Sequence, residues 1–125
     1  MVFIYGGAYQ GKTDFAKKNY NLTDDDIFYF TGQTGFDVNK KCLNGYHALV
    51  LSQIKAGIDP LARLEENIGA LKNKIIIADD ISAGVVPIDA ETRKWREAAG
   101  RCATLISTNA DEVWRVFCGI GSKIK

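Results

Sequence analysis

The segment with the clearest capacity for chemistry is a glycine-rich loop near the N-terminus, Gly6-Gly7-Ala8-Tyr9-Gln10-Gly11-Lys12-Thr13. It fits the phosphate-binding pattern G-x-x-x-x-G-K-[ST] at every fixed position. Its glycines allow positive φ angles and a close approach of the backbone, so that successive N–H groups can cradle an anion. Lys12 can reach the outer phosphates of a nucleotide, and the Thr13 hydroxyl is placed to bind the accompanying Mg²⁺. The loop therefore predicts a site for a nucleoside triphosphate with magnesium.

The residues on either side of this loop fit a strand-loop-helix unit. Met1 to Tyr5 is a short apolar run of the kind found in buried strands, and Asp14 to Tyr20 fits the beginning of a helix. The N-terminus of that helix would add to the anion cradle. The alternative is a glycine-rich turn that fits the pattern by chance. Such a turn need not lie between a strand and a helix, whereas the phosphate-binding motif must.

Two carboxylates follow a second predicted strand. The run KIIIA, Lys74 to Ala78, is typical of a central parallel strand, and Asp79 and Asp80 stand at its end. Because ligands bind at the carboxyl ends of strands in open α/β sheets, we expect this pair to meet the metal or the attacking hydroxyl. Asp80 is the candidate for holding the metal or accepting the substrate proton, with Asp79 in support. The acidic triplet Asp24 to Asp26, in contrast, is interpreted as a solvated turn.

The remaining patterns alternate between strands and helices. Strands are predicted at Ile27 to Thr31 and Glu112 to Cys118, and helices at Leu43 to about Ala56, Asp59 to Leu71, and Asp89 or Glu91 to about Ser107. Such alternation indicates βαβ units. The predicted fold is α/β and P-loop nucleoside triphosphate hydrolase-like, with a mostly parallel sheet flanked by helices. Residues 1–125 would form a single nucleotide-binding domain.

The composition excludes several classes of protein. The 16 Lys and Arg residues nearly balance the 15 Asp and Glu residues, so we expect no nucleic acid partner. No apolar run approaches the roughly 20 residues that a membrane span requires, and we expect a cytoplasmic protein. The three cysteines are widely spaced and include no C-x-x-C pair, which argues against a disulfide framework or a zinc site.

Three further motifs, together with the loop, resemble one known family. They are Asp79-Asp80-Ile81-Ser82-Ala83-Gly84-Val85-Val86-Pro87, Arg93-Lys94-Trp95-Arg96-Glu97-Ala98-Ala99-Gly100-Arg101 and Ala110-Asp111-Glu112-Val113-Trp114. They are similar to motifs of the bifunctional adenosylcobinamide kinase / adenosylcobinamide-phosphate guanylyltransferase family of cobalamin biosynthesis. The resemblance implies transfer of the γ-phosphate of ATP or GTP to the aminopropanol hydroxyl of adenosylcobinamide. It also implies phosphate or substrate contacts for Arg96 and Arg101, and a homo-oligomer.

The middle of the chain departs from the family pattern. About a dozen residues separate Thr31 from the next predicted helix, and they lack the histidine that becomes guanylylated in the family. Asn44 stands where the family has an acidic strand end. The only histidine, His47, is expected on an apolar helix side with Leu43 and Val50, which favours a structural role over substrate contact or nucleotidyl transfer.

Two hypotheses for function follow from these observations. The first is an adenosylcobinamide kinase in which the guanylyltransferase half is lost or weak, with Lys12, Asp80 and Asp79 as the catalytic residues. The second is a degenerate nucleotide-binding module with a regulatory or assembly role. Asn44 and the short middle segment favour the second, whereas the intact Lys12, Thr13 and Asp80 favour the first.

Overall fold

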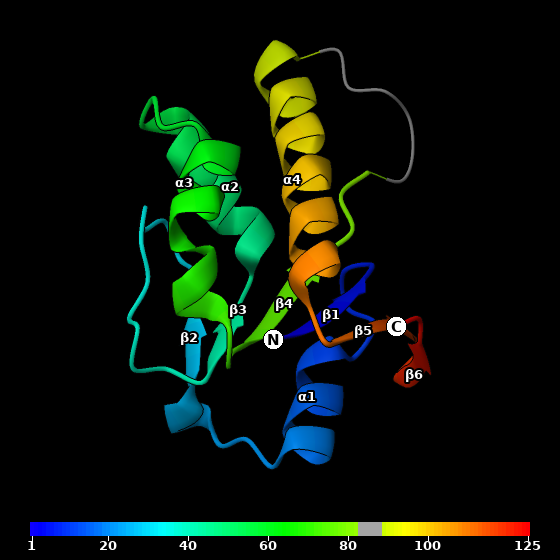
Figure 1. Cartoon of the computed structure of the whole chain (residues 1–125). Helices are drawn as coiled ribbons and strands as arrows, with labels where there is room; N and C mark the ends of the chain where they lie inside the picture. Colours follow the sequence, from blue (N-terminus) through cyan, green and yellow to red (C-terminus); the bar gives the residue numbers. More distant parts are fainter. Residues whose placement is uncertain (83–88) are drawn as a thin grey trace.

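One sheet organises the molecule, in the strand order β2-β3-β4-β1-β5-β6 (Figure 1). This is a computed structural model, and it describes residues 1–82 and 89–125. The strands are β1 (Val2–Gly6), β2 (Ile27–Tyr29), β3 (Cys42–Asn44), β4 (Ile75–Asp79), β5 (Glu112–Phe117) and β6 (Ile120–Lys123). Neighbouring strands are parallel except for β5 and β6, which are antiparallel. The predicted α/β fold with a mostly parallel sheet is therefore confirmed.

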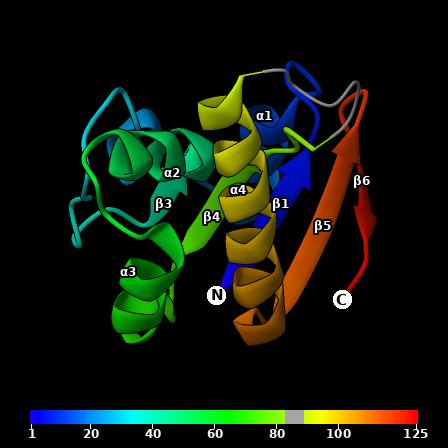
Figure 2. The same ribbon diagram turned by 90° about the horizontal axis from the view of Figure 1, so that it is seen from above.

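Helices cover both faces of the sheet. They are α1 (Lys12–Tyr20), α2 (Tyr46–Lys55), α3 (Pro60–Asn67) and α4 (Ala90–Asn109), with short 3-10 helices η1 (Asp24–Asp26) and η2 (Ile68–Leu71). Helix α1 lies on one face, and α2, α3 and α4 lie on the other (Figure 1). Figure 2 shows α4 passing in front of β4 and β1, with β5 and β6 to one side of it. None of the helices in the described residues is long and apolar enough to span a membrane.

The core has two parts because successive side chains of a strand point to opposite faces. Phe3 of β1 belongs to the cluster that packs beneath α2, α3 and α4, together with Ile76 and Ile106. Its neighbour Ile4 belongs to the cluster beneath α1, together with Val116. Both clusters fix β1 between β4 and β5, at the centre of the sheet. The end of β1 is consequently held from both faces.

Two strands were not predicted from the sequence. The helix expected from Leu43 begins at Tyr46, and Leu43 instead lies in β3, fully buried between β2 and β4. Gly45 separates the two elements with a φ of 95°, a conformation that glycine adopts without strain. The second is β6 (Ile120–Lys123), which returns along β5 through a tight turn at Cys118 and Gly119. Residues 83–87 of the motif Asp79 to Pro87 lie outside the described part.

Candidate active site

The glycine-rich loop joins β1 to α1 at the carboxyl edge of the sheet, and two of its glycines are required by close packing. A Cβ atom on Gly6 would lie 2.4 Å from the carbonyl oxygen of Val116. Gly11 has a φ of 87°, and its Cβ would lie 3.1 Å from the Cα of Gly119. Both positions therefore need glycine for steric reasons, besides any need created by a ligand.

The turn between β5 and β6 braces this loop through Gln10. The backbone N–H of Cys118 donates to Oε1 of Gln10 over 2.7 Å, and the N–H of Gly119 donates to the Gln10 carbonyl oxygen over 2.7 Å. The side chain and the backbone of one loop residue are thus held by consecutive residues of the hairpin turn. The sequence suggested no such role for Gln10, because the contact depends on a strand that was not predicted.

Lys12 is folded back into the protein. Its Nζ donates to the carbonyl oxygen of Gly7 over 2.6 Å and lies 2.7 Å from Oδ1 of Asp79. The lysine side chain is 7% exposed. Two of the three predicted catalytic residues, Lys12 and Asp79, are therefore in direct contact.

Thr13 contacts the end of β3. The Nδ2 of Asn44 donates to Oγ1 of Thr13 over 2.8 Å. The sequence marked Asn44 only as a departure from the family pattern, and the structure places it against the hydroxyl that is predicted to bind the metal. A neutral amide therefore lies beside Thr13 at the position where the resemblance implies a carboxylate.

His47 lies in the first turn of α2 and faces Asp79. The backbone N–H of Asp79 donates to Nδ1 of His47 over 3.0 Å, and Nε2 lies 3.4 Å from Oδ2 of the same residue. Because Nδ1 accepts this hydrogen bond, the neutral ring carries its proton on Nε2. Burial lowers the pKa of His47; the charge of Asp79 opposes this effect and that of Lys12 adds to it. His47 does lie near Val50, as expected, but its ring also contacts the polar end of β4, which the sequence did not indicate.

Asp80 has a different set of partners from Asp79. It accepts hydrogen bonds from the hydroxyl and the backbone N–H of Ser82 over 2.5 and 2.9 Å, and from the Tyr5 hydroxyl over 3.2 Å. Burial acts to raise the pKa of Asp80, but these hydrogen bonds and the nearby Arg115 outweigh it, so the pKa lies below the usual range. Burial and Asp80 raise the pKa of Tyr5 to about 12. Asp80 is therefore an ionised acceptor at neutral pH.

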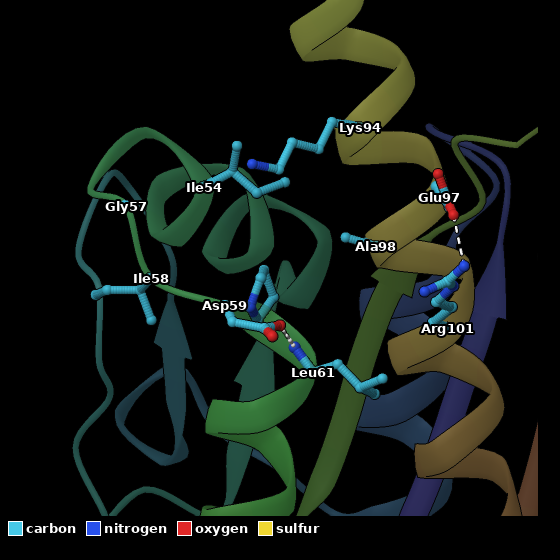
Figure 3. A pocket seen from close by; sticks show the side chains of 10 residues that line it. Ile54, Gly57, Ile58, Asp59, Leu61, Lys94, Glu97, Ala98 and Arg101 are labelled. Carbon is cyan, nitrogen blue, oxygen red and sulfur yellow. Dashed lines mark hydrogen bonds and ion pairs between the residues drawn. The ribbon is translucent and has the colours of Figure 1, made fainter.

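The two candidate arginines lie on different sides of α4. Arg96 donates to the carbonyl oxygen of Ser82, which places it beside Asp80. Arg101 pairs with Glu97 at 2.6 Å and lines a cavity of about 430 Å³ between α4 and the α2–α3 connection (Figure 3). The structure thus brings Arg96, and not Arg101, to the carboxyl edge of the sheet.

The donor atoms at this edge fit magnesium delivered with a nucleotide. Within residues 1–82 and 89–125, no cluster of three or more His, Cys, Asp or Glu side chains could hold a metal ion. Magnesium prefers oxygen ligands and commonly uses one or two protein groups together with substrate phosphates and waters. The Thr13 hydroxyl and the carboxylates at the end of β4 supply oxygens of this kind.

A family model and two relatives of known name indicate the same protein family. The family model for cobinamide kinase / cobinamide phosphate guanyltransferase matches residues 38–124, well over half of the chain. Two relatives are each named bifunctional adenosylcobalamin biosynthesis protein CobU. The one from Salmonella typhimurium (strain LT2) is 39% identical and the one from Escherichia coli (strain K12) is 37% identical, each over 51 residues. Those residues make up 41% of this chain and 28% of each relative, so the match spans little more than a quarter of the relatives' length.

Proposed function

The chain belongs to the cobinamide kinase / cobinamide phosphate guanyltransferase family, and from this premise we propose that it transfers the γ-phosphate of ATP or GTP to the aminopropanol hydroxyl of adenosylcobinamide. The observation that carries this proposal is the contact of Lys12 with Asp79, because it joins the phosphate loop to a strand-end carboxylate. A reaction of this type depends mainly on positioning and on charge neutralisation. The loop and the carboxyl edge of the sheet supply groups for both tasks.

Each group at this edge has a distinct proposed role. The loop N–H groups hold the β- and γ-phosphates, and Lys12 exchanges its contact with Asp79 for one with the phosphates. Magnesium supplies further charge neutralisation when it is bound, and Thr13 and Asp80 are the residues proposed to hold it. Asp80 also accepts a hydrogen bond from the attacking hydroxyl. Its lowered pKa suits it to orienting that hydroxyl. As the new O–P bond forms, the bond from the γ-phosphorus to the leaving nucleoside diphosphate breaks, and the hydroxyl proton passes to an oxygen of the transferred phosphoryl group.

We propose that the guanylyltransferase activity is lost or weak. A nucleotidyl-histidine requires a ring nitrogen with a free lone pair and space for a phosphate. In His47, Nδ1 accepts from the backbone of Asp79, and Nε2 faces a carboxylate that would repel the incoming phosphate. Incubation with GTP labelled on the α-phosphate tests this directly. An adduct that disappears in a His47→Ala variant would overturn it.

A nucleotide-binding module without transfer activity is the second candidate. The contact between Asn44 and Thr13 favours it, because an amide cannot supply the negative charge of a carboxylate beside the metal. This candidate predicts nucleotide binding without product formation.

One assay separates the two candidates. Purified protein is incubated with γ-labelled ATP or GTP, magnesium and adenosylcobinamide, and the corrinoid fraction is examined for label. The kinase proposal expects labelled product from the wild type and none from Lys12→Ala. If the wild type binds both reactants and yields no labelled corrinoid, the kinase proposal is wrong and the module is favoured.

A further inference from the structure

A groove of about 570 Å³ runs along the side of α4 that faces β5. Phe3, Tyr5 and Val113 of β1 and β5 form its floor, and Gly100, Ala103 and Thr104 of α4 form one wall. In Figure 2, α4 passes in front of β4 and β1, and β5 lies to one side of it. Its volume falls within the range of about 300 to 1,000 Å³ found for small-molecule sites.

The groove leads to the reaction edge through Tyr5. Tyr5 lines the groove, and its hydroxyl donates to Asp80. Arg115, which lies opposite Tyr5 in the pairing of β1 with β5, lines the same end. Arg96 stands one turn before Gly100 on α4 and contacts Ser82. The polar groups nearest to the proposed site of phosphoryl transfer therefore lie at one end of the groove, whose lining is largely apolar.

We infer that this groove binds the phosphoryl acceptor, an inference that rests on the proposed function. The acceptor would be an amphipathic molecule with amide groups and an arm that ends in a hydroxyl. Its arm and the adjoining part of the molecule lie along the apolar floor, and the hydroxyl reaches Asp80. Among the described residues, Asp80 is the carboxylate that accepts a hydrogen bond from a residue of the groove, Tyr5.

The wall of the groove offers hydrogen-bond acceptors for amides. The Thr104 hydroxyl donates to the carbonyl oxygen of Gly100 over 3.0 Å, and the Thr108 hydroxyl donates to that of Thr104 over 2.9 Å. Each hydroxyl thus directs its proton into its own helix and keeps oxygen lone pairs for a partner. Amide N–H groups are donors that match such oxygens. The wall is accordingly suited to a neutral, amide-bearing ligand.

Gly100 allows the groove to be filled without disturbing the fold. A Cβ atom at this position meets no heavy atom within 4 Å, so a larger side chain would extend into open space. Replacement of a glycine within a helix also favours the helical state. Gly100→Leu is therefore a direct steric test of the groove. Gly100→Ala, which adds only one carbon atom, is the milder variant at the same position. Gly69→Leu, in η2, is a matched control at another glycine with open space around its Cβ.

The experiment measures binding of adenosylcobinamide by equilibrium dialysis, binding of nucleotide by calorimetry, and transfer of label. Gly100→Leu should weaken acceptor binding about tenfold or more, while nucleotide binding stays within about twofold of the wild type. Gly69→Leu should change neither. Thr104→Val, which removes a hydroxyl at nearly constant volume, should weaken acceptor binding several-fold and gives a second test that does not depend on Gly100.

The outcomes separate this inference from the proposed function. If the wild type transfers phosphate and Gly100→Leu binds the acceptor as well as the wild type does, the groove assignment is wrong and the kinase stands. If the wild type binds the acceptor without transfer and Gly100→Leu abolishes binding, the groove is confirmed and the kinase is wrong. If the wild type binds no acceptor, both are wrong.

Discussion

Lys12 and Asp79 form an ion pair in which 2.7 Å separates Nζ from Oδ1, with the lysine side chain 7% exposed and the aspartate 27% exposed. A phosphate that reaches this lysine must therefore compete with a carboxylate of the protein. Asp79 retains a second neighbour, His47, on its other oxygen. Nucleotide binding and the arrangement of these three side chains are consequently linked.

Replacement of Lys12 by Ala should weaken nucleotide binding by about tenfold to a hundredfold, the range expected for one or two charge-assisted hydrogen bonds. Isothermal titration calorimetry with ATP and GTP measures this change. Lys17→Ala is the matched control, because Lys17 pairs with Asp24 outside the loop. Equal effects of the two substitutions would show that general charge, and not the position of Lys12, determines binding.

Replacement of Asp79 by Asn should have opposite effects on binding and on transfer. Nucleotide binding in the presence of EDTA should become several-fold tighter for two reasons. Lys12 no longer has to break an ion pair with Asp79 before it contacts the phosphates, and one negative charge that repels the phosphates is removed. Transfer to the acceptor should become slower. Calorimetry in EDTA together with a single-turnover assay measures the two quantities. Weaker binding in EDTA would contradict the proposed competition.

Replacement of Asn44 by Asp should make nucleotide binding more dependent on magnesium. A carboxylate beside Thr13 repels phosphates when the metal is absent and attracts the metal when it is present. The ratio of the dissociation constants in EDTA and in magnesium should therefore rise by about tenfold. Asn39→Asp, in the loop between β2 and β3, introduces the same charge as a control. An equal ratio in both variants would count against a local role for Asn44.

The stability of the protein should depend on pH through His47. Its pKa is lower in the folded chain than the usual value near 6.5, first because of burial and then because of Lys12, with Asp79 opposing. The unfolded chain therefore binds the proton more readily, and the contribution of the neutral ring is present above about pH 6.5 and is lost as the pH falls below it. Urea denaturation between about pH 7.5 and pH 5.5 should show a steeper fall for the wild type than for His47→Gln. Parallel curves would exclude His47 as the cause.

The loop and the buried strands allowed much of this fold to be predicted. The apolar runs Met1 to Tyr5 and Lys74 to Ala78 indicated neighbouring parallel strands in a buried sheet, and that arrangement is confirmed. The glycine pattern of Gly6 to Thr13 placed a loop at the carboxyl edge of this sheet, and a nucleotide bound there stays a prediction. Strand β3 escaped prediction because three residues are too few to show a period, and Leu43 continues the helical spacing of the residues that follow.

The contacts at the site were less predictable than its location. The sequence named Asp79 and Asp80 as a pair, but only the direction of each side chain shows that Asp79 contacts Lys12 whereas Asp80 contacts Tyr5. Similarly, Arg96 and Arg101 share a charged helix, and five residues turn them by more than a right angle around its axis. These differences depend on packing between segments distant in sequence, which local spacing does not encode.

The bonds from the β5–β6 turn to Gln10 join residues that are 108 positions apart. During synthesis the loop therefore leaves the ribosome well before the turn that braces it. Contacts of this separation form late, because the chain between them must first lose its freedom. A nascent chain that has not yet released the β5–β6 hairpin therefore has the loop sequence without its braced shape. Nucleotide affinity should accordingly arise only after this hairpin has formed.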